Sequence, residues 1–243
     1  MEKELRNSFI AGAGKVAGGE YKDIRISGSG RMDGDITCES LHISGSGHAM
    51  GVEAGEIRAS GSFRAERSVK AQSIHVSGSA HIGGTVEVCN IHASGAFHAG
   101  GLVSAKEIHA SGSIHAESGI EADKVVLSGG ADIKGLLNAE EIEIRLGGKC
   151  RIAEIGGERI QVRKGKNSVN LSFNIFRLSK RFAYCMLEAN SIEGTEVYLE
   201  NTICPVVRAK KAYIGEGCEI GRIEYEETIE IHEGAVVKEQ VKI

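Results

Sequence analysis

The dipeptide Ser-Gly recurs through the first half of the chain at an almost constant spacing. The spacing is 17 residues except for one step of 16, and the dipeptide stands at Ser27, Ser44, Ser60, Ser77, Ser94, Ser111 and Ser128. A fixed short period is typical of a protein built from one unit copied along an axis, where each copy buries its apolar face only against its neighbours. We therefore expect a repeat protein rather than a globular domain.

Apolar residues take the same places in each copy and alternate with polar ones. This period-two pattern indicates strands with one buried face. One copy lacks a residue, so its Val52 stands eight places after the repeat serine Ser44. The equivalent Val69 of the next copy stands nine places after Ser60. Stacked copies would align the inward residues in ladders. We single out six of them as core and assembly residues, Ile74, Val76, Ile91, Val103, Ile108 and Ile120.

Each copy reads as two or three short strands joined by corners that contain glycine. We expect glycine there because sharp corners often require a positive φ. A copy of this size fits one coil of a solenoid whose ladders step by about 4.8 Å. The predicted fold class is all-β, a parallel β-helix with coils of about 17 residues, followed by a shorter C-terminal solenoid.

Composition excludes several classes of function. Aromatic residues are 5% of the chain and tryptophan is absent, as expected if a narrow lumen cannot hold large side chains. The net charge of -4 and the lack of a stripe of basic residues argue against binding to nucleic acid. The six cysteines form no CxxC pair and are predicted to be reduced and structural. The sequence has no glycine-rich, phosphate-binding loop of the Walker type. We predict no cofactor, no metal and no catalytic residue.

The chain divides into four predicted segments. Residues 1–20 are a flexible lead-in, 21–162 the main β-helix, 163–190 a linker or insertion, and 191–243 the C-terminal β-helix coils. In the last segment Val197, Ile214 and Ile231 are again 17 residues apart, which predicts equivalent places in about three coils. The third segment carries Phe173, Phe176, Arg177 and Phe182. It is either a linker that packs on the solenoid or a docking element for a partner or a membrane surface.

Eight of the nine histidines fall in two columns of the repeat, between inward positions, so their side chains are expected to point to solvent. Three stand on consecutive coils in each column. These are His75, His92 and His109, and His81, His98 and His115. Protonated rings at this spacing would repel one another, which predicts a solenoid less stable or less prone to associate below about pH 6. Solvated ladder residues without a role, and chelation of a transition metal, are the alternatives.

Neither end of the repeat shows a sequence that would cap it. The last residues, 236–243, alternate like a strand. An uncovered coil offers unpaired backbone groups to another chain, so end-to-end polymerisation is the physical expectation.

The segments 27–30, 44–47 and 32–36 resemble repeats of the bactofilins, the polymer-forming cytoskeletal proteins of bacteria. The segments 197–202 and 214–221 are similar to segments of longer members of this family from Gram-positive bacteria. The resemblance implies a right-handed parallel β-helix that forms nonpolar filaments without nucleotide. It also implies that these filaments scaffold other proteins in cell shape, motility or envelope processes. The partners expected are other copies of the chain and recruited proteins, with peripheral membrane contact left open.

Two other functions compete with a filament. One is a monomeric β-solenoid that binds partners on its flat faces. The other is a hexapeptide-type acyltransferase, whose pattern residues 214–221 fit locally although the main array does not. We predict a cytoplasmic protein, because residues 1–19 lack the apolar region of a signal peptide and no apolar run is long enough for a membrane span.

Overall fold

The computed structural model describes residues 5–165 and 185–243, and these form a parallel β-solenoid of about 13 turns, as the repeat predicts. Within the described residues there is no helix, and hence none that is long and apolar enough to cross a membrane. The chain divides into two compact units, Met1–Ile120 and Glu121–Ile243.

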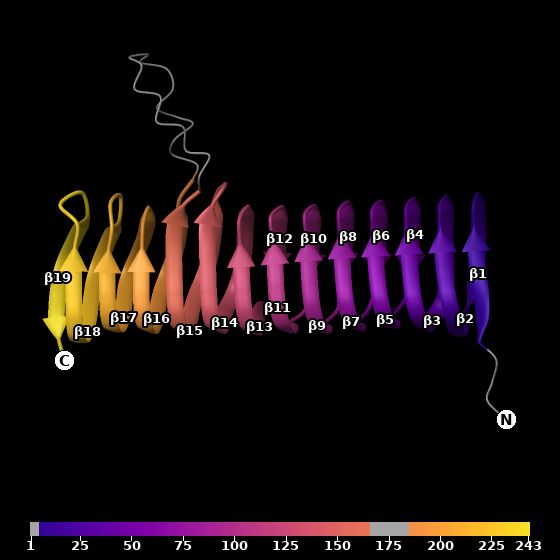
Figure 1. The fold of residues 1–243 in the computed structure, drawn as a ribbon, viewed down its shortest axis with the longest axis horizontal. Helices are drawn as coiled ribbons and strands as arrows, with labels where there is room; N and C mark the ends of the chain where they lie inside the picture. The colour runs from indigo at the N-terminus through magenta and orange to yellow at the C-terminus, as the bar shows by residue number, and fades with distance from the viewer. Residues whose placement is uncertain (1–4, 166–184) are drawn as a thin grey trace, which may run out of the picture. The chain divides into compact units, whose positions relative to one another are not determined.

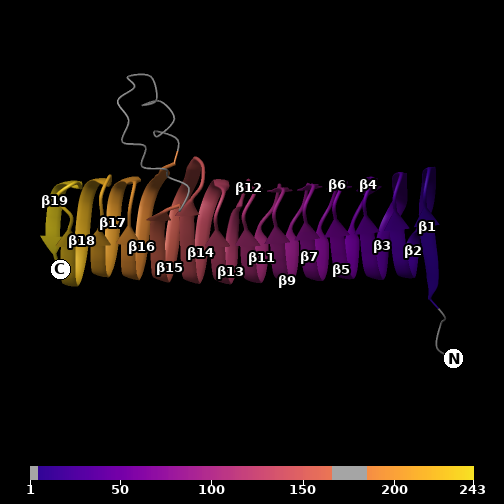
Figure 2. The same ribbon diagram turned by 45° about the horizontal axis from the view of Figure 1, so that its top comes forward.

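The first unit consists of parallel strands that lie side by side on successive coils (Figure 1). In chain order they are β1 (Arg6–Ile10), β2 (Ala13–Ile26), β3 (Ser29–Ile43), β4 (Ser46–Ala49), β5 (Val52–Ala59), β6 (Ser62–Ala65), β7 (Val69–Val76), β8 (Ser79–Ile82), β9 (Val86–Ala93), β10 (Ala96–Ala99), β11 (Val103–Ala110) and β12 (Ser113–Ala116). The turned view in Figure 2 separates the two sets in this array. Strands β5, β7, β9 and β11 form one wall and β4, β6, β8, β10 and β12 another.

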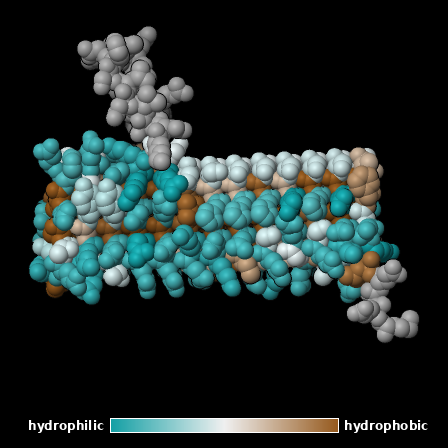
Figure 3. Space-filling view, viewed as in Figure 1, coloured by the Kyte–Doolittle hydropathy of each residue, from teal (hydrophilic) through white to brown (hydrophobic). Residues whose placement is uncertain are grey.

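The register follows the repeat. Ile74 lies beside Ile91 and Ile91 beside Ile108, while Ile36 lies beside Val52 despite the missing residue. All six predicted ladder residues are buried. Figure 3 shows the effect of this in-register stacking on the surface, where residues of like hydropathy line up in rows along this unit.

The lead-in predicted for residues 1–20 is wrong for the described part. Strand β1 pairs with β2 in the register of the later coils, with Ile10 beside Ile26. Strand β2 pairs with β3 in the same way, with Val16 beside Met32. Ile10 and Val16 are both buried, so the apolar ladder begins a coil earlier than the Ser-Gly repeat indicates.

The lumen holds larger side chains than composition predicts. Phe63 and Phe97 are each 1% exposed and belong to the same inward column. Phe63 lies between Gly47 and Ala80 in that column, and Phe97 lies between Ala80 and Ile114. Each ring thus has at least one small neighbour in its column, which leaves space for the larger side chain.

The glycine of the Ser-Gly corner is explained by crowding and not by φ. Among the described glycines, positive φ occurs at Gly19, Gly34, Gly119 and Gly217, none of which follows a repeat serine. Instead, a Cβ on Gly95 would overlap the backbone oxygen of Gly78 in the preceding coil. The same overlap with the preceding corner recurs at Gly28, Gly45, Gly61, Gly78 and Gly112. These corners stack backbone on backbone.

The second unit also consists of parallel strands. They are β13 (Gly119–Leu127), whose first two residues belong to the first unit, β14 (Gly130–Leu146), β15 (Cys150–Lys164), β16 (Leu187–Leu199), β17 (Thr202–Ile214), β18 (Glu219–Ile231) and β19 (Val236–Lys242). Strand β15 pairs directly with β16, with Ile160 beside Val197. The coils before and after residues 166–184 therefore stack on each other. The predicted C-terminal coils belong to the same unit as β14 and β15.

The predicted equivalence of Val197, Ile214 and Ile231 is half right. Ile214 does lie beside Ile231, but the neighbour of Val197 is Ala212, and Leu199 lies beside Ile214. The reason is that the step from β16 to β17 is 15 residues, as from Leu187 to Thr202, so a spacing of 17 misses the register by two.

Candidate functional site

Two columns of histidine rings lie on the outside of the first unit. Strands β7, β9 and β11 place His75, His92 and His109 side by side. Strands β8, β10 and β12 do the same for His81, His98 and His115. Each ring stands between two inward residues of its strand, as His75 does between Ile74 and Val76, so alternation turns it outward.

The rings within each column are stacked nearly parallel. Ring centroids in the first column are 5.1 Å apart for His75 and His92 and 5.3 Å apart for His92 and His109. In the second column they are 4.3 Å apart for His81 and His98 and 4.5 Å apart for His98 and His115. The in-register stacking predicted from the spacing is therefore present.

The middle ring of each column has a lowered pKa. Partial burial, followed by the neighbouring rings His75 and His109, lowers the pKa of His92. Partial burial, followed by His81 and His115, likewise lowers the pKa of His98. Glu107 and Glu117 act in the opposite direction on these two rings but do not reverse the shift. The fold therefore favours the neutral form of both middle rings.

This shift gives the first unit a pH-dependent stability. A histidine whose pKa is lower in the folded than in the unfolded chain binds fewer protons when folded, so stability is lost as pH falls through the unfolded value of about 6.5. We expect the melting temperature to fall between about pH 7 and pH 5. The double variant His92→Gln and His98→Gln should lose less over the same range in thermal melts followed by circular dichroism. Equal losses in both proteins would contradict this role for the rings.

Carboxylates accompany the outer rings of both columns. Glu56 lies 3.6 Å from His75 and Glu107 lies 3.6 Å from His109. The closest pair is His115 and Glu117, with Nε2 and Oε1 2.6 Å apart. The sequence interpretation missed Glu117, although residues two apart on a strand share a face and the pair could have been found from that rule.

All six cysteines are free, and four are buried. Burial raises the pKa of the Cys38, Cys150, Cys204 and Cys218 thiols to about 11. These thiols stay protonated at neutral pH and are poor nucleophiles, so they act as small apolar residues of the core.

The second unit has an aromatic pair that the sequence interpretation missed. The rings of Tyr198 and Tyr213 stack with centroids 4.5 Å apart, and the guanidinium of Arg163 lies 5.1 Å from the Tyr198 centroid. Tyr198 donates a hydrogen bond of 2.6 Å to Glu200, which together with burial raises its pKa to about 12. The two tyrosines stand 15 residues apart, so a search at 17 does not align them.

The core columns of the second unit end on side chains that are partly open to solvent. Ile214 is fully buried, but its neighbour Ile231 on the next coil is 37% exposed. In the adjacent column Ile220 is buried and Val237, beside it on β19, is half-buried. Among the described strands β19 pairs only with β18, so its far edge has no neighbour there.

In the first unit, β1 pairs only with β2 among the described strands. Its Phe9 lies in the column of Arg25 and His42 and is 68% exposed. The predicted docking residues Phe173, Phe176, Arg177 and Phe182 lie outside the described residues.

Comparison with known proteins gives relatives but no function. No protein-family model matches the chain. It is 41% identical over 110 residues to the uncharacterized protein YhbF of Bacillus subtilis. This alignment covers 45% of this chain and 42% of YhbF. It is 36% identical over 96 residues to the uncharacterized protein YhbE of the same organism. That alignment covers 38% of this chain and 37% of YhbE. The matches therefore span less than half of either relative, and no solved structure matches the chain.

Proposed function

We propose that this chain is a non-enzymatic structural protein that assembles end to end into filaments without nucleotide. The filaments would scaffold other proteins, as the resemblance to bactofilins implies for cell shape, motility or envelope processes. The observation that carries the proposal is the edge of β19, which pairs only with β18 among the described strands, beside the apolar column that runs from Ile214 to the exposed Ile231.

A second copy of the chain is the occupant that fits this edge. An unpaired parallel strand presents backbone N–H and C=O groups in the spacing that another coil of the same kind can meet. A stacked coil would also remove Ile231 and Val237 from water, as each earlier coil does for the one before it. Contacts that use both end coils of each copy do not close on themselves and so extend without limit.

We also propose a cytoplasmic location. All six cysteines are unpaired, and four of them are buried in the lumen of the solenoid. Free thiols of this kind suit a compartment in which disulfides rarely persist.

Charging the last coil should stop assembly without unfolding the chain. The variant Ile231→Lys and Val237→Lys places two ammonium groups at the open edge, where a stacked coil would have to bury them. The control Glu230→Gln and Glu239→Gln changes the net charge by the same amount at exposed positions on the same two strands. We expect filaments in electron micrographs of the control. Light scattering of the edge variant should show only single chains or pairs.

Circular dichroism keeps this test interpretable. The edge variant should retain the β spectrum and melting temperature of the control, since both substituted side chains are already partly exposed. Filaments of the edge variant as long as those of the control would refute assembly through this coil. Single chains in both, and in the wild type, would leave a monomeric binding scaffold as the function.

A further inference from the structure

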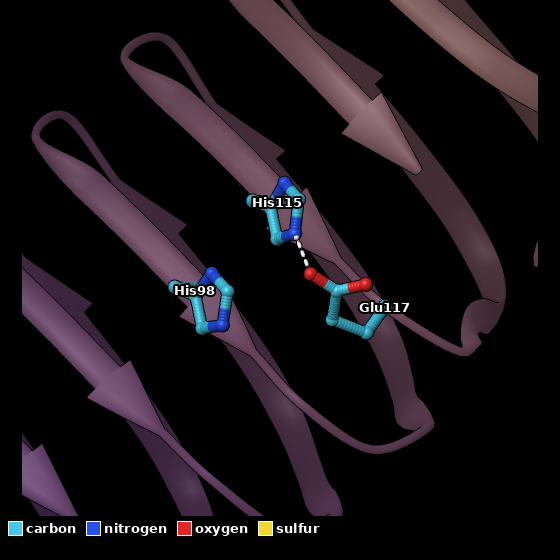
Figure 4. A group of neighbouring side chains, drawn as sticks. All are labelled: His98, His115 and Glu117. Atoms are coloured by element: carbon cyan, nitrogen blue, oxygen red, sulfur yellow. Dashed lines mark hydrogen bonds and ion pairs between the residues drawn. The ribbon is translucent and has the colours of Figure 1, made fainter. Parts of the chain in front are cut away.

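The second histidine column ends in a compact group of possible metal ligands. Figure 4 shows His98 and His115 on neighbouring strands β10 and β12, with the Glu117 carboxylate turned toward the His115 ring. The two rings are 5° from parallel, with centroids 4.5 Å apart. One ligand atom from each of the three residues lies within 4.8 Å of the other two.

We propose that His98, His115 and Glu117 bind a divalent transition-metal ion such as Zn²⁺. Two imidazole nitrogens and one carboxylate oxygen are ligands that zinc commonly takes, and a water molecule would fill the fourth position of a tetrahedron. Imidazole nitrogen selects zinc, copper or nickel over magnesium and calcium, which prefer oxygen ligands alone.

The ligand atoms of His98, His115 and Glu117 lie close to the separations that a tetrahedral zinc site requires. Zinc–ligand distances of about 2.0–2.1 Å put tetrahedral ligands about 3.3 Å apart. The more distant ligand atoms, now up to 4.8 Å apart, must therefore approach by about 1.5 Å at most. His115 Nε2 and Glu117 Oε1, now 2.6 Å apart, must separate by about 0.7 Å. Both of these side chains reach solvent, since His115 is 26% and Glu117 51% exposed.

Other histidine–carboxylate pairs on this unit are less suited to a cation. At His48 the nearby carboxylate of Glu66 also accepts a hydrogen bond from Arg64, which lies beside His48 on the adjacent coil. That guanidinium would repel a bound ion. His75 and His109 lie 3.6 Å from Glu56 and Glu107. Among the described residues, only His98, His115 and Glu117 form a group of three with ligand atoms this close.

Binding can be measured on the full chain after treatment with a chelator. We expect Zn²⁺ titrated into the wild type to bind with one ion per chain by isothermal titration calorimetry, and Co²⁺ to give the visible absorption of a tetrahedral site. His115→Gln should weaken the affinity at least tenfold, and Glu117→Gln should weaken it while leaving the fold unchanged. The matched control is His92→Gln, which removes a ring from the other column.

The outcomes separate this site from other binding. Absence of saturable Zn²⁺ binding to the wild type would overturn the proposal. So would equal losses in His115→Gln and His92→Gln, or unchanged affinity in His115→Gln, which would direct attention to a thiol such as the half-buried Cys89. Assembly does not enter the readout, because the edge variant Ile231→Lys and Val237→Lys should bind the ion as the wild type does.

Discussion

Replacing Ile91 with aspartate should unfold the first unit. Ile91 is fully buried and lies between Ile74 and Ile108 on the neighbouring coils. Truncating a buried isoleucine costs about 2–5 kcal/mol, and a carboxylate without a partner in the same place costs more. Because a domain is stable by only about 5–15 kcal/mol in total, we expect loss of the cooperative melting transition. Circular dichroism and thermal melts measure this directly.

The neighbouring residue supplies the control. Asn90→Asp puts the same carboxylate one position along β9, on the half-buried outer side, and should leave the melting temperature within a few degrees of the wild type. Ile91→Val should cost about 0.5–1.5 kcal/mol, between the two. If Ile91→Asp melted like Asn90→Asp, residue 91 would not line a packed lumen.

The second large effect is expected from a single methyl group at the Ser-Gly corner. In Gly95→Ala the added Cβ meets the backbone oxygen of Gly78, which cannot rotate away as a side chain can. Ser94 and Ala96 donate backbone hydrogen bonds of 2.8 and 2.9 Å to the preceding coil, so separating the coils would strain both. Overpacking of this kind costs about 1–3 kcal/mol, and a rigid neighbour puts the loss at the upper end. Urea denaturation of the two proteins gives the difference.

Gly12→Ala is the matched substitution. Gly12 holds the same corner in the first coil, and a Cβ there has nothing within 4 Å. We expect no loss of stability from it. A similar loss in Gly12→Ala and Gly95→Ala would mean that the corner requires glycine for its backbone conformation and not for close stacking.

The spacing of the repeat was sufficient to predict the fold and the histidine columns. A constant period fixes which residues stack, so Ile74, Ile91 and Ile108 could be placed in one ladder and His75, His92 and His109 in another from the sequence alone. Alternation then decides which ladder points inward. Neither step needs any knowledge of the corners.

Features that depend on distances between coils could not be read from the period. The role of Gly95 rests on how closely two backbones approach, and the room for Phe63 and Phe97 rests on the small residues beside them in another coil. The Tyr198 and Tyr213 pair was missed because one coil of the second unit is shorter. Glu117 shares a face with His115, but that it lies close enough to bind a metal with His98 is visible only in three dimensions.

Electron microscopy of the purified wild-type chain at neutral pH, without nucleotide or metal, tests end-to-end assembly most directly. We expect filaments, and diffraction from aligned filaments should give a reflection at about 4.8 Å along the filament axis, since stacked coils would continue from one copy to the next. Single chains of uniform size would contradict assembly, and filaments with this spacing across the axis would contradict stacking through the terminal coils.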